Sequence, residues 1–307
     1  MKEVKKFSIK TKIELSKILE RIETHFSDNR VIKLLDEYHS KSKAHVIGIT
    51  GPPGVGKSSV INKLVYHLRK KKLSIGIIAI DPSSKKSGGA ILGDRARFDI
   101  DPADNEIFVR SMAARDYLGG ISELTFPSMI VMRSVFDILI IETVGVGQSE
   151  ISIENVADTV VFCVQPGSGD TLQFIKSGII EIPDVITVTK SDLSSIANAT
   201  VTDLNSSKIY LTNDLDWDIE ILSVSSHKDE GFEELIKTFD NRWIWLNEKK
   251  ILNKKRFEQD IEWIKKSIIN NFGFRGLVLA NEKIKYVDQP FNCFNNIKNN
   301  FDLVFKS

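Results

Sequence analysis

The sequence predicts an α/β fold with a mostly parallel, twisted sheet flanked by helices. A buried-strand pattern over 46–49 precedes the glycine-rich segment 51–58, and apolar residues at helical spacing follow over 60–68. Short runs rich in Val and Ile then recur between helical patterns, which is typical of parallel strands joined by crossover helices. Further runs of this kind cover residues 75–80, 107–109, 136–141, 159–164, 185–188 and 221–224.

The segment GPPGVGKS at 51–58 fits the phosphate-binding pattern G-x-x-x-x-G-K-[ST] in its strand–loop–helix context. Glycines let backbone N–H groups point at phosphate oxygens beside a helix N-terminus. Lys57 can reach the outer phosphates, and the Ser58 hydroxyl can ligate Mg²⁺. The pattern therefore predicts a P-loop NTPase fold. Its expected phosphate-binding residues are Gly51, Pro52, Pro53, Gly54, Val55, Gly56, Lys57, Ser58 and Ser59.

Carboxylates follow two more of the apolar runs, where ligands gather in such sheets. Asp81 and Glu142 each close a predicted strand, and Asp94 lies in a glycine-containing loop. Carboxylate oxygens suit Mg²⁺, which takes few ligands from the protein and keeps most of its bound waters. For residues 81–94, a turn with a solvated Asp remains an alternative. Gly145 would let a backbone N–H approach the γ-phosphate, and Gln148 could orient the attacking water. The candidate catalytic residues are Lys57, Asp94, Glu142 and Gln148, and the candidate metal ligands are Ser58, Asp81, Asp94 and Glu142.

The tetrapeptide Thr189-Lys190-Ser191-Asp192 follows the run 185–188 and resembles the guanine-binding signature N-K-x-D. A carboxylate at Asp192 can accept hydrogen bonds from guanine N1–H and its exocyclic amine, a pair that adenine does not offer. A buried polar group left unpaired costs about 1–3 kcal/mol, so the wrong base is rejected. The Lys190 stem can lie over the base, and Ser223, Val224 and Ser225 follow the last strand, where a backbone N–H meets the base oxygen.

Composition limits the remaining possibilities. The 307 residues allow one large domain with appendages, and a net charge of +1 gives no reason to expect nucleic acid or an acidic membrane as a partner. The two cysteines, Cys163 and Cys293, form no disulfide framework, and no run has membrane-spanning length. We expect a soluble cytoplasmic protein with a helical extension over 1–43, a nucleotide-binding domain over 44–240 and a helical extension over 241–307.

Two groups of side chains leave alternatives open. Arg110 and Arg115 could meet phosphate or a partner, but surface ion pairs are at least as well supported. The tryptophans in the C-terminal segment, Trp243, Trp245 and Trp263, could pin that segment to the core or form a subunit interface.

With these motifs, residues 46–231 resemble the MeaB/ArgK (MMAA-like) family of G3E P-loop GTPases, which are related to signal-recognition GTPases. The resemblance rests on GPPGVGKS at 51–58, DPSS at 81–84, GD at 93–94, ETVGVGQSE at 142–150 and PGSGD at 166–170. It implies slow, partner-stimulated GTP hydrolysis with Mg²⁺, and a chaperone that gates adenosylcobalamin loading of an acyl-CoA mutase, most often methylmalonyl-CoA mutase. It also implies a homodimer, with 241–307 as a possible dimerisation arm, and a segment containing Asp170 and Lys176 that reports nucleotide state to the mutase.

One position departs from the family pattern, because Thr189 replaces the Asn that ties the base-binding loop to the P-loop. The shorter side chain is expected to loosen nucleotide affinity. Three other functions are compatible with the fold: an arginine/ornithine (LAO/AO) transport ATPase or kinase, a metal-delivery GTPase and a signal-recognition GTPase. Metal delivery would need a thiolate and imidazole cluster, and the sequence has no C-x-x-C or C-x-H. A non-catalytic GTP-binding module is a further alternative.

Overall fold

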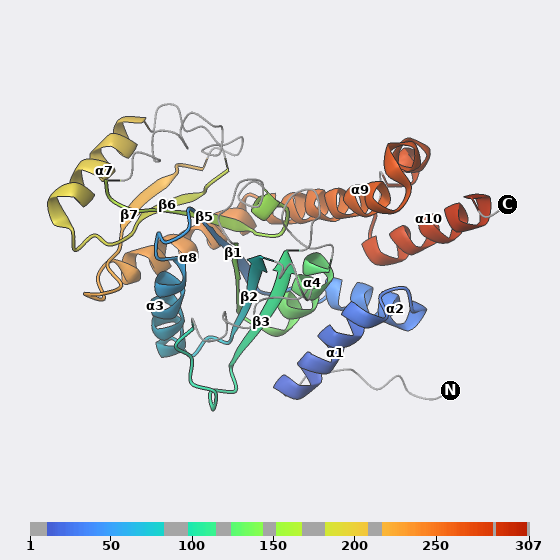
Figure 1. The fold of residues 1–307 in the computed structure, drawn as a ribbon, viewed down its shortest axis with the longest axis horizontal. Helices are drawn as coiled ribbons and strands as arrows, with labels where there is room; N and C mark the ends of the chain where they lie inside the picture. The colour runs from blue at the N-terminus through green and yellow to red at the C-terminus, as the bar shows by residue number, and fades with distance from the viewer. Residues whose placement is uncertain are drawn as a thin grey trace.

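A seven-stranded parallel sheet forms the centre of the protein (Figure 1). The computed structural model describes residues 11–82, 98–114, 124–143, 152–167, 182–207, 217–284 and 287–305. The strand order is β3-β2-β4-β1-β5-β6-β7, and all six strand pairs are parallel. The strands are β1 (His45–Thr50), β2 (Ile75–Pro82), β3 (Ile107–Ala114), β4 (Ile138–Glu142), β5 (Thr159–Val164), β6 (Val185–Val188) and β7 (Glu220–Ser223). The predicted runs thus form strands of one sheet.

Helices cover both faces of this sheet, which is why the strands are apolar throughout. Along β1, Val46 packs into one hydrophobic core and Ile47 and Ile49 into another on the opposite face. The second core lies under α3 (Lys57–Lys70) and α8 (Phe232–Glu248). The first lies under α4 (Thr125–Val135) and the terminal helices, and α7 (Ser194–Ser207) packs near β6 and β7. The predicted α/β architecture is confirmed.

The N-terminal extension consists of α1 (Lys12–Thr24) and α2 (Asn29–His39). Thr11 and Glu14 form a capping box at the start of α1, and Asp28 caps α2 by accepting a hydrogen bond from the Arg30 N–H. Both helices bury one apolar stripe in the first core. Arg110 of β3 donates to Glu23 of α1 at 2.5 Å, so the ion-pair alternative for this arginine holds.

The C-terminal segment packs back on the same side of the sheet as α1 and α2 (Figure 1). Helix α8 continues through residue 240 and is followed by α9 (Ile251–Ala280), with a kink at Gly273 where φ is 67°, and then α10 (Pro290–Phe305). Two short 3-10 helices, η2 (Ile153–Asn155) and η5 (Asn281–Ile284), precede β5 and α10. No helix in the described ranges is both long and apolar enough to cross a bilayer.

Trp263 of α9 fixes this segment to the core. Its ring lies 4.8 Å from Phe291 of α10, 5.4 Å from Phe126 of α4 and 6.2 Å from Phe26, measured between centroids. Only 6% of Trp263 is exposed. Of the two alternatives for the tryptophans, Trp263 therefore pins the tail to the core, where an aromatic side chain contributes the largest apolar area.

Candidate nucleotide-binding site

Several of the predicted site residues lie close together, because the carboxyl ends of the central strands are side by side. Ile49 of β1 is in register with Glu142 of β4, and Val164 of β5 with Val188 of β6. Loops that leave these strands therefore surround one edge of the sheet, where ligands bind in open α/β folds.

The P-loop at 51–58 closes with three glycines in backbone conformations that other residues rarely adopt. The φ angles of Gly51, Gly54 and Gly56 are 135°, 74° and 101°. At Gly51 a Cβ atom would lie 2.3 Å from the carbonyl oxygen of Cys163, so the loop packs directly on β5. Cys163 is fully buried, which raises the pKa of its thiol to about 12. Gly56 ends the loop as the N-cap of α3.

The Lys57 ammonium lies inside this loop. Its Nζ donates to the carbonyl oxygens of Gly51 at 2.6 Å and Pro52 at 3.0 Å, and only 7% of the residue is exposed. A cation held among backbone groups at a helix N-terminus makes the loop a site for anionic oxygens.

Ser58 and Glu142 lie in direct contact beside the loop. The Ser58 hydroxyl donates to Glu142 Oε1 at 3.0 Å, and the glutamate is 3% exposed. Thr143 follows on the same edge and is held by its hydroxyl bond to Thr50 at 2.8 Å. A hydroxyl and a carboxylate are hard oxygen donors, so this pair fits the chemistry of Mg²⁺ with phosphate and water as further ligands.

The remaining predicted catalytic and metal residues are placed only in part. Asp81 lies near the carboxyl end of β2, two residues beyond Ala79, which is in register with Glu142. Other predicted residues lie outside the described ranges, namely Asp94, Arg115, Gly145, Gln148, Asp170 and Lys176.

Thr189 ties the predicted base-binding loop to the P-loop. Its hydroxyl lies 2.7 Å from the carbonyl oxygen of Val55 and 3.0 Å from that of Val164, and the residue is buried. Because its side chain is shorter than that of the usual Asn, Thr189 is expected to connect the two loops more loosely. The hydroxyl still makes the contact, because the end of β6 passes close to Val55. The tie between the two loops is therefore present.

Lys190 and Asp192 extend from the same loop. Lys190 has a left-handed backbone, and its Nζ donates to the carbonyl of Gly54 at 3.1 Å and to Gln165 Oε1 at 2.9 Å. Asp192 Oδ1 accepts a 2.7 Å hydrogen bond from the Ser225 hydroxyl, which lowers the pKa of Asp192 and keeps it a carboxylate. One carboxylate oxygen is thus fixed by Ser225.

Backbone hydrogen bonds hold the predicted segment 223–225 in place next to the site. The Val224 N–H donates to the carbonyl of Val188, and the Ser225 N–H donates to that of Glu230. The next two residues, Ser226 and His227, line the cavity itself.

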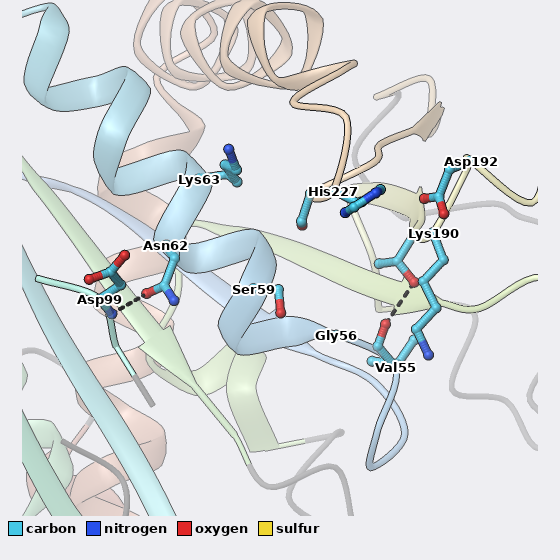
Figure 2. Close-up of a pocket in the computed structure, with 11 residues that line it drawn as sticks. Val55, Gly56, Ser59, Asn62, Lys63, Asp99, Lys190, Asp192 and His227 are labelled. Carbon is cyan, nitrogen blue, oxygen red and sulfur yellow. Dashed lines mark hydrogen bonds between the residues drawn. The ribbon is translucent and has the colours of Figure 1, made fainter. Parts of the chain in front are cut away.

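A cavity of about 460 Å³ lies between α3 and these loops. Figure 2 shows Ser59, Asn62 and Lys63 of α3 on one side, and Lys190, Asp192 and His227 on the other. Such a volume is within the range of small-molecule sites. The lining consists of Val55, Gly56, Ser59, Asn62, Lys63, Asp99, Thr189, Lys190, Asp192, Ser226 and His227.

Five lining residues were not among the predicted site residues: Asn62, Lys63, Asp99, Ser226 and His227. Asn62 and Lys63 lie three and four positions after Ser59, so helical periodicity places them on the same face of α3 and could have found them. No sequence pattern indicates that Asp99 lines the cavity, because its position depends on the hydrogen bond from its N–H to Asn62 Oδ1, across 37 positions of sequence.

Comparison with known proteins identifies a family and several relatives of this chain. The family described as "Methylmalonyl Co-A mutase-associated GTPase MeaB" matches residues 15–276. A putative GTPase of Pyrococcus abyssi is 40% identical over 243 residues, covering 76% of this chain and 74% of that protein. GTPase ArgK of Escherichia coli is 31% identical over 72% of this chain and 68% of ArgK. The Caenorhabditis elegans protein named methylmalonic aciduria type A homolog, mitochondrial, is 32% identical over 77% of this chain and 62% of its own length.

Solved structures share the fold. An LAO/AO transport system kinase superposes with a TM-score of 0.67 at 22% identity, covering 94% of this chain and 93% of the other. The hydrogenase maturation factor HypB of Archaeoglobus fulgidus gives a TM-score of 0.51 at 18% identity, over 75% of this chain and 98% of HypB. At these identities the likeness concerns architecture alone.

Proposed function

This chain belongs to the MeaB family of methylmalonyl-CoA mutase-associated GTPases and is itself a GTPase, and from that premise we propose that it gates adenosylcobalamin loading of a B12-dependent acyl-CoA mutase and protects that enzyme. The observation that supports its nucleotide-binding part is that the P-loop and the loop with Thr189 and Asp192, which we propose binds guanine, are joined by the Thr189–Val55 contact. The client is inferred from the family description and from the relative named as a methylmalonic aciduria homolog.

In this proposal the residues around the P-loop bind and orient the phosphates. Lys57 exchanges its bonds to the Gly51 and Pro52 carbonyls for bonds to phosphate oxygens. Ser58, with Glu142, Asp81 and Asp94, would hold Mg²⁺, which neutralises charge on the β- and γ-phosphates. Gly145 and Gln148 are the proposed groups for the γ-phosphate and the attacking water.

The proposed partner contact lies in the segment that contains Asp170 and Lys176, and a homodimer is part of the same proposal.

The proposal is tested by measuring GTP hydrolysis with and without a purified adenosylcobalamin-dependent mutase from the same source. We expect the mutase to accelerate hydrolysis by about tenfold or more, since partner-completed GTPase sites gain at least this much. ATP serves as the control nucleotide. Unchanged GTP hydrolysis in the presence of the mutase would rule out this client.

Asp192→Asn tests the base-binding part of the site. The carboxylate accepts from N1–H and the amine of guanine, whereas an amide donates to the additional carbonyl oxygen of xanthine. We expect GTP affinity to fall about tenfold or more and xanthosine triphosphate to become the preferred ligand. Asp203→Asn, on the exposed surface of α7, is the control. Equal GTP affinity in wild type and Asp192→Asn would remove this role from Asp192.

The transport-kinase and metal-delivery alternatives have less support. The structures that bear those names are below 25% identical to this chain, so they show the fold and not the activity. Within the described ranges, no group of three or more His, Cys, Asp or Glu side chains could hold a metal ion. The Mg²⁺ site proposed above needs no such group, because phosphate and water supply most of its ligands.

A further inference from the structure

A short loop after β7 connects the guanine-binding carboxylate to α3. The loop, residues 225–231, is closed by paired backbone bonds: the Ser225 N–H donates to the carbonyl of Glu230 at 3.0 Å, and the Glu230 N–H donates to that of Ser225 at 3.1 Å. The Ser225 hydroxyl accepts from the Lys228 N–H at 3.1 Å and donates to Asp192 at 2.7 Å. The position of Asp192 therefore depends on the conformation of this loop.

Asp229, at the tip of the loop, contacts two side chains of α3. His67 Nε2 lies 3.0 Å and Lys63 Nζ 3.3 Å from Asp229 Oδ1. A carboxylate only accepts hydrogen bonds, so the imidazole donates. The His67 bond is the main reason that the pKa of Asp229 is lowered, with a further contribution from Lys63. His67 is only 13% exposed and stacks on the buried Phe232 ring with centroids 5.8 Å apart, so its ring is held in place.

The backbone of the loop leaves little freedom once Asp229 is anchored. Asp229 has a φ of 59°, and Gly231 has a φ of 82° where a Cβ would lie 2.1 Å from the carbonyl oxygen of Ser223. Left-handed positions of this kind fix the direction of the chain on either side. An anchor at Asp229 therefore constrains Ser225 across the small ring of bonds that joins them.

We propose that Asp229, held by His67 and Lys63, is a positioning residue that sets guanine specificity through Ser225 and Asp192. Helix α3 begins at Lys57 and Ser58 in the proposed phosphate site, and its Asn62 and Lys63 line the cavity (Figure 2). One turn further along, His67 contacts the loop through Asp229. One rigid helix thus aligns the phosphate site with the base site. This inference rests on the proposed recognition of guanine by Asp192.

The test compares the affinities of GDP and inosine diphosphate (IDP), which lacks the exocyclic amine that Asp192 is proposed to bind. Asp229→Asn keeps a residue type that tolerates the left-handed backbone but loses the charge. His67→Phe keeps the stacking on Phe232 and removes the donor. We expect the GDP-over-IDP preference to fall about fivefold in each variant, and by less than the product of the two falls in the double variant, because both variants weaken the same His67–Asp229 contact.

A purely structural role would lower the melting temperature and weaken both nucleotides equally, leaving the preference unchanged. Asp240→Asn is the matched control: it removes the exposed Lys71–Asp240 pair, 2.9 Å long, which joins the C-cap residue of α3 to α8 and lies outside the loop. An unchanged preference in folded Asp229→Asn and His67→Phe would overturn the inference. If Asp229→Asn does not fold, His67→Phe decides. Asp192→Asn separates the two proposals: if it leaves the preference unchanged, the base-binding role itself fails.

Discussion

Lys57→Ala is expected to raise the dissociation constant of GDP by about 100-fold or more, which corresponds to about 2.8 kcal/mol. The ammonium is almost fully buried among the P-loop carbonyls. Its removal takes away the cation that we propose contacts the phosphates, and it leaves the Gly51 and Pro52 oxygens without this donor. Titration with a fluorescent GDP analogue measures the change.

The control for this experiment is Lys237→Ala, which removes an exposed lysine from α8. Thermal denaturation with and without GDP gives a second reading. A ligand at 100 times its dissociation constant stabilises the folded state by about 2.7 kcal/mol, and this gain should fall to about 0.4 kcal/mol or less in Lys57→Ala at the same GDP concentration. Wild-type affinity in a folded Lys57→Ala protein would contradict the assignment of the phosphate site.

The sheet and the convergence of its loops could be predicted because buried parallel strands are apolar on both faces. Each predicted run formed a strand, and Glu142 at the end of one run came into contact with Ser58 at the end of the P-loop pattern, across 84 positions of sequence. Hydrophobic periodicity and the P-loop pattern indicate the strands and the residues at their ends from short stretches of sequence. The position of Glu142 beside Ser58 needs only that β1 and β4 are neighbours.

Other contacts could not be predicted because they depend on distances between backbones. The hydroxyl of Thr189 reaches Val55 only because the end of β6 lies close to the P-loop. The anchor at Asp229 depends on a left-handed turn, and neither Asp229 nor His67 belongs to a recognisable motif. Charged residues are usually exposed, so no pattern in the chain indicates that Arg133 and Arg242 are almost completely buried.

A buried ion pair joins α9 to the amino ends of the central strands. Asp158, just before β5, accepts from Arg256 Nε at 2.9 Å and Nη2 at 2.7 Å, and from the Val46 N–H of β1 at 2.9 Å. Asp158 is fully buried. Burial opposes its ionisation, but Arg256 and the nearby Arg133 outweigh this effect and lower the pKa of Asp158 to about 2. The ionised state of the Asp158 carboxylate therefore depends mainly on Arg256.

Arg256→Ala is expected to destabilise the protein by about 3–5 kcal/mol, because it leaves a buried carboxylate without its main partner. A folded-state pKa below the unfolded value of about 3.9 contributes stability above that pH. The difference between variant and wild type should therefore be complete at pH 7 and shrink as the pH falls towards 2. Urea denaturation at several pH values measures it.

The control is Lys71→Ala, which breaks the exposed pair with Asp240 and should cost no more than about 1 kcal/mol. The double variant Asp158→Asn with Arg256→Leu removes both charges, while the amide oxygen that it introduces can still accept from the Val46 N–H. We expect it to recover more than half of the loss, since replacing a whole buried pair is often close to neutral. A double variant as unstable as Arg256→Ala would show that packing of the arginine, and not the unpaired charge, holds α9 to the sheet.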